Sequence, residues 1–241
     1  LRLVELWLGI PKDKPASVSQ HIISGLEYMS PSNILYRLEL YQKRFDNLLT
    51  LKQENPNTID GGESDSTINE FWDTKGKSWG MEFLLKKSSG KFNGWLGYTY
   101  SQTEYFTEPS NWHYPNFDRT HTLNLVLNFE LTSDLEFSSA VTQSSGNPYT
   151  KILGRVYDWE QNLNSNTYWY PYDSYIIGDK NTERYDGYYR VDIGLTRKGG
   201  NLFGLQYDTY WQVMNVTKHL NIFSYAYRTK IDPLSGDQLG V

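Results

Sequence analysis

The stretch NFDRTHTLNLVLNFEL, residues 116–131, contains a pattern with a period of two residues. From Leu123 onward, apolar side chains occupy every second position, and polar side chains fill most of the gaps. The apolar positions are Leu123, Leu125, Leu127, Phe129 and Leu131. Because successive side chains of a β-strand point to opposite faces, this pattern predicts a strand whose two faces contact different surroundings.

The length of this pattern exceeds that of an ordinary strand. Strands of globular proteins usually contain about five or six residues. Residues 123–131 would span about 30 Å at roughly 3.3 Å per residue. At a tilt of about 35–45°, that length covers the apolar band of about 25 Å that a transmembrane β-barrel presents to lipid. The stretch therefore favours a strand that crosses a membrane.

The same alternation recurs along most of the chain, more weakly in some segments than in others. Tight turns separate successive segments, which is typical of strands paired in sequence order. We therefore predict eight consecutive antiparallel strands. They span residues 17–29, 33–46, 78–88, 91–103, 119–131, 134–144, 187–198 and 202–228, the last as one long strand.

The alternation also predicts which side chains contact lipid. The polar side chains between the apolar ones would be desolvated without hydrogen-bond partners if the faces were reversed. The residues expected to face lipid include Leu123, Leu125, Leu127, Phe129, Trp79, Phe83, Val191 and Ile193. Charged residues on the opposite face, such as Arg37 and Glu82, are expected to form a charge ladder in a wet interior.

The composition agrees with an all-β transmembrane protein. Aromatic residues make up 16% of the chain, with 20 Tyr and 8 Trp, although the mean hydropathy is −0.63. A barrel with a polar interior and aromatic girdles produces this combination. The sequence contains no apolar run of the roughly 18 residues that a membrane helix needs. The absence of Cys argues against a disulfide-stabilised secreted scaffold, and a net charge of −5 gives no nucleic-acid footprint.

The predicted connections alternate between short and long. Short turns occur near residues 31–33, 88–91, 131–134 and 198–202, and long connections occupy about 47–78, 104–118 and 144–183. Outer-membrane barrels have short periplasmic turns and long external loops. We therefore expect the three long connections to lie outside the cell.

Six segments together resemble the C-terminal part of a TonB-dependent outer-membrane transporter of a Bacteroidetes-like type. The segments are KPASVSQHIISGLEY, WGMEFLLKKSSGKFNGWLGYTYS, YPNFDRTHTLNLVLNF, SSGNPYT, YYRVDIGLTRK and WQVMNVTKHLNIFSY. They are dispersed across most of residues 14–228. The most specific feature is the order in which Phe117, Asp118 and His121 precede an alternating strand, with Ser145-Gly146-Asn147-Pro148 following it.

This resemblance implies that residues 1–241 form part of a larger antiparallel transmembrane β-barrel of about 22 strands. The eight strands would be roughly the fourteenth to the twenty-first, and the plug, the front half of the barrel and the last strand would lie outside this sequence. The implied function is active import of a scarce solute, which binds at external loops and enters with energy transmitted by TonB. The implied partners are outer-membrane lipid, the N-terminal plug and the remaining barrel, the TonB complex acting through the plug, and a surface lipoprotein. No nucleic acid is among them.

Aromatic residues in two long connections are the candidate ligand-binding residues. Rings provide a large contact area and stack on sugars or planar groups. The candidates are Trp112, His113 and Tyr114 in the first connection, and Trp159, Tyr168, Trp169, Tyr170 and Tyr172 in the second. An aromatic girdle with loops that pack on themselves is the structural alternative for both clusters.

The sequence predicts neither an enzyme nor a cofactor. Its four His residues lack metal-ligand spacing, and it contains no nucleophile elbow. Asp118 and His121 stand at the entrance of a strand, where structural hydrogen bonding is a better explanation than a catalytic dyad. The acidic side chains at 54–73 fit a solvated loop better than a calcium site.

Two other functions fit parts of the sequence. A soluble or surface β-sandwich could present aromatic loops to a carbohydrate or another ligand, and it would remain in buffer without detergent. A small barrel of about eight strands, closed on itself, could act as a membrane anchor. The substrate of a transporter, whether siderophore, cobalamin, peptide or glycan, does not follow from these residues.

Overall fold

The fold is known from a computed structural model, which describes residues 12, 14–51, 71–107, 111–161 and 169–225. All regular elements among these residues are β-strands. No helix in the described ranges is long and apolar enough to cross a membrane. The all-β class predicted from the alternation is therefore confirmed.

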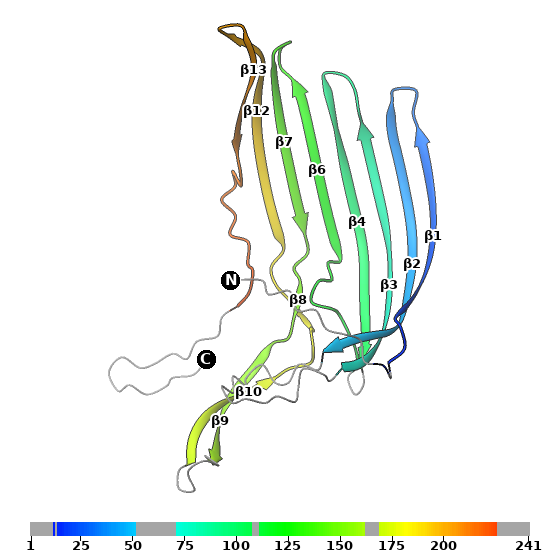
Figure 1. The fold of residues 1–241 in the computed structure, drawn as a ribbon, viewed down its shortest axis with the longest axis vertical. Coiled ribbons are helices and arrows are strands. Elements are labelled where there is room, and N and C mark those ends of the chain that lie inside the picture. The colour runs from blue at the N-terminus through cyan, green and yellow to red at the C-terminus, as the bar shows by residue number, and fades with distance from the viewer. Residues whose placement is uncertain (1–11, 13, 52–70, 108–110, 162–168, 226–241) are drawn as a thin grey trace, which may run out of the picture.

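Eight long strands form one antiparallel sheet in sequence order (Figure 1). They are β1 (Val18–Met29), β2 (Ile34–Leu51), β3 (Phe71–Lys87), β4 (Phe92–Thr107), β6 (His121–Glu130), β7 (Leu135–Ser144), β12 (Tyr188–Leu202) and β13 (Leu205–Val213). Each predicted span overlaps one of these strands, although four of the strands extend beyond the predicted bounds. The predicted order and the antiparallel pairing are confirmed.

The prediction for the last strand is wrong in its length. β13 ends at Val213 instead of continuing to residue 228, and residues 226–228 lie outside the described ranges. Asn215 and Lys218 adopt positive φ angles of 51° and 54°, which interrupt an extended chain. Asn221 then takes the place of a strand partner, because its side-chain amide accepts from the Tyr189 N–H (2.9 Å) and donates to the Tyr189 carbonyl (3.1 Å).

Short turns lie at one end of the sheet and long connections at the other (Figure 1). The β12–β13 turn is the tightest, with φ angles of 53° at Phe203 and 83° at Gly204. Positive φ at both central residues suits the twist of a two-residue hairpin turn. The predicted alternation of short and long connections is confirmed, although β2, β3 and β4 extend further into the long connections than expected.

The long connections contain further strands that the sequence did not predict. β5 (Trp112–His113) pairs with β4, and β8 (Pro148–Tyr149) pairs with β11 (Glu183–Arg184). β9 (Ile152–Gln161) and β10 (Trp169–Ile177) form a separate hairpin. This hairpin extends beyond the long-connection end of the main sheet (Figure 1).

The register divides the sheet into two chemically different faces. Residues that pair directly across neighbouring strands share a face. One row of paired residues reads Tyr28, Tyr36, Leu85, Leu96, Leu125, Val141 and Val191. A row on the opposite face reads Gly25, Glu39, Glu82, Thr99, Thr122 and Ser144. We call these the apolar face and the polar face; the eight residues predicted to face lipid share the apolar face.

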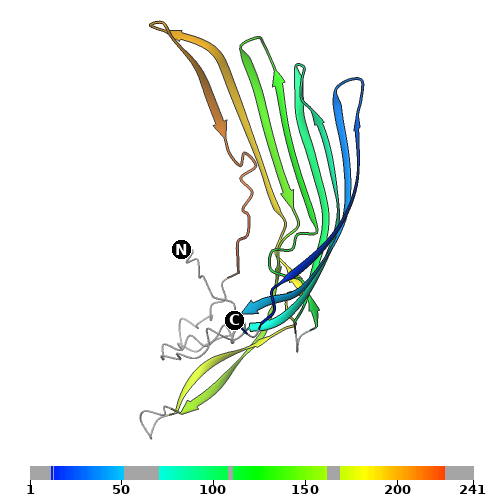
Figure 2. The same cartoon turned by 45° about the vertical axis from the view of Figure 1, so that its right-hand side comes forward.

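The sheet is curved and open (Figures 1 and 2). β1 and β13 are its two edges, and among the described residues neither edge pairs with a second strand. None of the described hydrophobic side chains is buried. On β1, Ile22 and Leu26 are 72% and 77% exposed. The described chain therefore has two uncovered faces and two unpaired edges instead of a hydrophobic core.

Candidate functional site on the polar face

A recess of about 350 Å³ lies on the polar face, next to the connection between β4 and β6. Strands β2, β3 and β4 contribute one wall, and residues 117–119 of the connection contribute the other. Its aromatic residues are Tyr41, Phe45, Tyr105 and Phe117; its hydroxyl residues include Ser78, Ser101 and Thr103; its basic residues are Lys43 and Arg119. The recess thus combines rings, hydroxyl groups and two cations.

Glycines in β3 make room for the rings. Gly76 pairs with Phe45 on one side and with Tyr105 on the other. A Cβ atom at Gly76 would lie 3.0 Å from both rings, so a larger residue would displace them. Tyr105 also meets Phe117 edge to face, with ring centroids 6.1 Å apart. This contact joins the sheet to the connection that closes the recess.

The floor of the recess is hydroxylated and its rim is cationic. Ser78 and Thr103 share a hydrogen bond of 2.9 Å across β3 and β4, and Ser101 donates to the Arg119 carbonyl at 3.0 Å. The Lys43 ammonium lies 4.7 Å from the centre of the Tyr41 ring. Such a surface can stack on a ring and bind the oxygen atoms of a polar solute.

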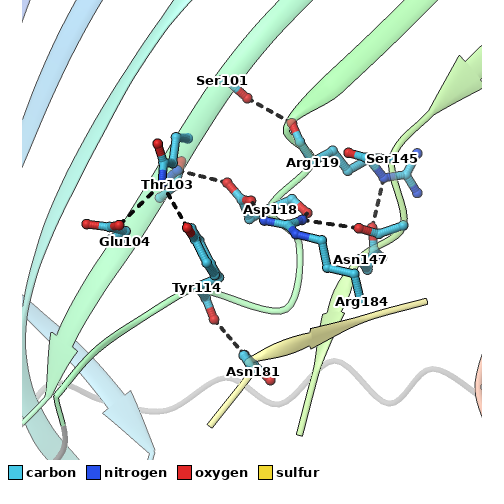
Figure 3. Close-up of polar contacts among 12 residues, drawn as sticks. Ser101, Thr103, Glu104, Tyr114, Asp118, Arg119, Ser145, Asn147, Asn181 and Arg184 are labelled. Atoms are coloured by element: carbon cyan, nitrogen blue, oxygen red, sulfur yellow. Dashed lines mark hydrogen bonds and ion pairs between the residues drawn. The ribbon is translucent and has the colours of Figure 1, made fainter. Parts of the chain in front are cut away.

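Asp118 fixes the wall of the recess (Figure 3). Its carboxylate is buried and accepts hydrogen bonds from the Thr103 N–H at 2.8 Å and from Arg184 Nη2 at 2.5 Å. The charge of Asp118 is therefore compensated inside the protein. A buried carboxylate needs such compensation, because an unpaired charge would carry a large desolvation cost.

Arg184 joins three segments through one guanidinium group. Its Nη1 donates to the carbonyl oxygens of Asp118 at 3.2 Å and Gly146 at 3.1 Å. Its guanidinium carbon lies 4.8 Å from the centre of the Tyr114 ring. Gly146 permits the close approach, because a Cβ atom there would lie 1.7 Å from the Tyr185 carbonyl oxygen.

Asn181 and Arg119 complete this network. The buried Asn181 amide donates to the Tyr114 carbonyl and to Asn116 Oδ1, both at 2.6 Å. Arg119 donates from Nε to Asn147 Oδ1 at 2.9 Å and from Nη1 to Ser144 at 3.0 Å. We call the contacts of Asp118, Arg184, Arg119 and Asn181 the seam, because they hold the three connections β4–β6, β7–β8 and β10–β12 together.

The structure places the first predicted aromatic cluster beside the seam. Trp112 is 47% exposed and packs on Phe106, with ring centroids 5.6 Å apart. Lys77 places its ammonium 4.3 Å from the centre of the Trp112 ring. The Tyr114 hydroxyl accepts from Gln102 Nε2 at 2.8 Å. Within this cluster, Trp112 is the residue whose side chain is available to a ligand.

His113 is buried instead of available to a ligand. Its Nδ1–H donates to the Asn111 carbonyl at 3.1 Å. Burial lowers the pKa of His113 below its ordinary value, and the positive charge of Lys180 lowers it further, against an opposing effect of the Asn111 hydrogen bond. The neutral form of the imidazole is therefore favoured over the protonated form.

The second predicted cluster lies on the β9–β10 hairpin. Trp159 belongs to β9, and Trp169, Tyr170 and Tyr172 belong to β10. Tyr168 lies outside the described residues. The register pairs Pro171 with Trp159. No residue of this hairpin lines the recess. The ligand-binding role of the second cluster stays a prediction.

Sequence reasoning missed the main lining of the recess. Tyr41, Phe45 and Lys43 occupy alternate positions of β2, but nothing in β2 itself shows that Gly76 and Ser78 lie beside them. The available signal was a pair of glycines, Gly76 and Gly80, inside an otherwise regular strand pattern. An internal glycine in a strand indicates a close approach by another group.

Several charged and acid–base side chains that the sequence singled out form hydrogen bonds or ion pairs within the protein. Arg37 pairs with Glu27 at 2.6 Å and Arg190 with Asp192 at 2.6 Å, and the charge ladder in a wet interior stays a prediction. His121 binds the Tyr98 hydroxyl through Nδ1 at 2.9 Å, whereas Asp118 binds Arg184. No group of three or more metal-ligating side chains occurs among the described residues. The acidic segment 54–70 lies outside these ranges.

Comparisons of the chain with protein-family models, with curated proteins and with solved structures find no match.

Proposed function

We propose that this sheet is part of the wall of a TonB-dependent outer-membrane transporter, with the apolar face in lipid and the polar face toward the lumen. The observation that carries the proposal is an eight-stranded sheet whose register separates an apolar face from a polar face, without a buried hydrophobic side chain among the described residues. In water that apolar face would be exposed, and the exposure would cost about 25 cal/mol of free energy for each Å² of apolar surface. Lipid removes this cost.

The dimensions of the strands support the same location. β6 contains 10 residues, or about 33 Å at roughly 3.3 Å per residue. A tilt of about 40° reduces this to about 25 Å along the membrane normal, which matches the apolar band of outer-membrane barrels. The other strands are as long or nearly so. Each strand can therefore cross the membrane once.

The two edges support a larger barrel. The outer backbone groups of β1 and β13 have no strand partner in the described sheet, and each unsatisfied group in hydrocarbon costs several kcal/mol. Further strands, contributed by polypeptide outside residues 1–241, would satisfy both edges. The resemblance to TonB-dependent transporters assigns this role to the rest of a barrel of about 22 strands.

The recess supports passage of a solute on the polar face. It brings four aromatic rings, four serine or threonine hydroxyls and two cations to the end of the sheet where the long connections lie. In the proposed orientation that end faces the outside of the cell, so solute would meet the recess before it enters the lumen. The partners that this function requires are a plug and a TonB complex acting through it.

The two alternative functions require features that the described residues lack. A β-sandwich would place a second sheet on the apolar face, yet the described chain contains one large sheet and two small two-stranded sheets. An anchor barrel of eight strands would pair β1 with β13, and these strands are not paired. The geometry therefore favours a larger barrel.

Surface labelling of cells that express the complete gene product tests this proposal. An epitope inserted within residues 162–168, between β9 and β10, should be reached by antibody on intact cells. The same epitope between Ser88 and Lys91, at the short-turn end, should be reached only after the outer membrane is opened. The protein should also stay in the membrane pellet after alkaline extraction. Release into buffer would contradict the proposal, and labelling of the two sites in the reverse order would overturn its orientation.

A further inference from the structure

A second hollow, of about 440 Å³, lies on the apolar face near the long-connection end of the sheet. We call it the outer groove. Tyr98, Leu123 and Gln143, which line it, belong to one row of paired residues across β4, β6 and β7. Its far end is formed by His121 and Ser145. The groove thus runs from hydrocarbon side chains to polar side chains along a face that is otherwise mainly apolar.

Aromatic rings of β3, β4 and β6 lie next to one another beside the outer groove. Trp79 and Tyr100 lie 5.4 Å apart between ring centroids, and Tyr100 and His121 lie 5.2 Å apart. Together with Tyr98 these rings form a band where the apolar face meets the polar connections. Rings that are apolar in body and polar at one end occur typically at the boundary between lipid tails and headgroups.

The polar end of the groove offers hydrogen-bond donors and no carboxylate. Gln143 makes no side-chain hydrogen bond to any described part of the chain, so its amide has two free donors. His121 uses Nδ1 for the Tyr98 hydroxyl; with that hydroxyl as the donor, Nε2 carries the ring hydrogen and can donate to a ligand. The Ser145 hydroxyl oxygen accepts from the His121 N–H at 3.1 Å, and its own hydrogen remains available.

A cation lies behind these donors. Arg119 lines the recess on the polar face and does not line the groove itself, but its Nη1 donates at 3.0 Å to the hydroxyl oxygen of Ser144, a residue at the groove whose side chain belongs to the polar face. The guanidinium of Arg119 is not in an ion pair with any described carboxylate; it donates to Asn147 and Ser144. Donors in front of a cation complement an anionic group rich in oxygen, and phosphate fits this description.

We propose that the outer groove binds the phosphate-bearing headgroup of one membrane lipid, whose acyl chains lie along the apolar face. The donors of Gln143, His121 and Ser145 hold the phosphate oxygens. The hydrocarbon row that continues from Leu123 to Leu125 and Val141 receives the chains. This inference rests on the proposed membrane location and adds to it a defined lipid site with a headgroup preference.

Lipid titration of the complete gene product, delipidated in detergent and followed by native mass spectrometry, tests this inference. The two probes are dioleoyl phosphatidylglycerol and dioleoylglycerol, which carry the same chains and differ in the phosphate headgroup. We expect one phosphatidylglycerol per chain to bind about tenfold more tightly than dioleoylglycerol, since a hydrogen bond to a charged group is worth about one factor of ten or more.

Two variants locate the site. Gln143→Leu should weaken phosphatidylglycerol binding about tenfold and leave dioleoylglycerol binding unchanged. Gln42→Leu is the matched control, because Gln42 pairs with Trp79 on the same apolar face but does not line the groove. The Gln42→Leu variant should bind phosphatidylglycerol as tightly as the unmodified protein does. Both variants make a lipid-facing surface more apolar, so both should remain folded.

The outcomes separate this inference from the proposed function. Equal affinity for the two lipids, or equal weakening by Gln143→Leu and Gln42→Leu, would overturn the lipid site while the protein still stays in the membrane pellet. A protein that is released into buffer and retains neither lipid would overturn the membrane location and the lipid site together.

Discussion

The side chain of Asp118 shows how one carboxylate can organise a whole connection. It is buried, and its two oxygens bind the Thr103 N–H and the Arg184 guanidinium. Removal of one partner from a buried ion pair is costly, because the other charge is left uncompensated. We expect Arg184→Met to lower the free energy of unfolding by about 3 kcal/mol, measured by denaturant titration in detergent.

An exposed ion pair provides the control for this experiment. Arg197 lies 3.8 Å from Asp134, and both side chains are more than half exposed. Exposed pairs contribute about 0–1 kcal/mol, so Arg197→Met should change stability by less than about 1 kcal/mol. The double variant Asp118→Asn/Arg184→Met should recover part of the loss. Equal effects of Arg184→Met and Arg197→Met would show that the seam is not a buried ionic network.

His113 should make the β4–β6 connection sensitive to acid. Its pKa is lowered in the folded protein by burial and by Lys180. Above about pH 6.5, the ordinary His value, both folded and unfolded chains hold it neutral and its stabilising effect is complete. As the pH falls below that value, the unfolded chain binds a proton that the folded chain resists, so stability is lost until the lowered pKa is reached.

Hydrogen exchange measures this acid sensitivity directly. After correction for intrinsic rates, amides at 111–120 should exchange faster at about pH 5.5 than at about pH 7.5. In His113→Gln the difference should disappear. An unchanged pH response in that variant would assign the sensitivity to another group.

At the scale of elements, β6 carries the strongest test of the two faces. Leu125 lies on the apolar face and Asn124 on the polar face. Arg at a lipid-facing position near the membrane midplane costs about 2–4 kcal/mol. We expect Leu125→Arg to lower the free energy of unfolding in lipid vesicles by that amount, and Asn124→Arg to lower it much less. A larger cost at Asn124 would reverse the assignment of the faces.

Strand positions could be predicted from sequence because alternation is a local property. The interiors of β3, β4, β6 and β7 follow directly from it. The ends could not be predicted in the same way, because they depend on partners: β13 stops where the Asn221 side chain replaces a strand as the partner of Tyr189. The recess required the pairing of Phe45 with Gly76 and of Gly76 with Tyr105. This register relates residues of three strands, so it cannot be read from any single stretch of the sequence.

At the scale of the whole molecule, the open edges predict that β1 and β13 are far apart in the assembled protein. Residues 1–241 contain no Cys, so none of their own side chains can form a disulfide with an introduced Cys. Leu26→Cys with Leu38→Cys joins register partners and should form a disulfide, which needs Cβ atoms about 3.5–4.5 Å apart. Leu26→Cys with Trp211→Cys should not, because in the proposed larger barrel further strands separate these edges. Efficient cross-linking of the second pair would indicate a small closed barrel acting as an anchor.

The proposed membrane barrel depends on the placement of the apolar face in lipid. The most direct test attaches one spin label at a time to residues 123–129 in the complete gene product, reconstituted in bilayers, and measures its accessibility to oxygen and to a water-soluble nickel complex. We expect oxygen accessibility to peak at Leu123, Leu125, Leu127 and Phe129, and nickel accessibility to peak at Asn124, Val126 and Asn128. The reverse pattern, or water accessibility at all seven positions, would contradict the proposed membrane barrel.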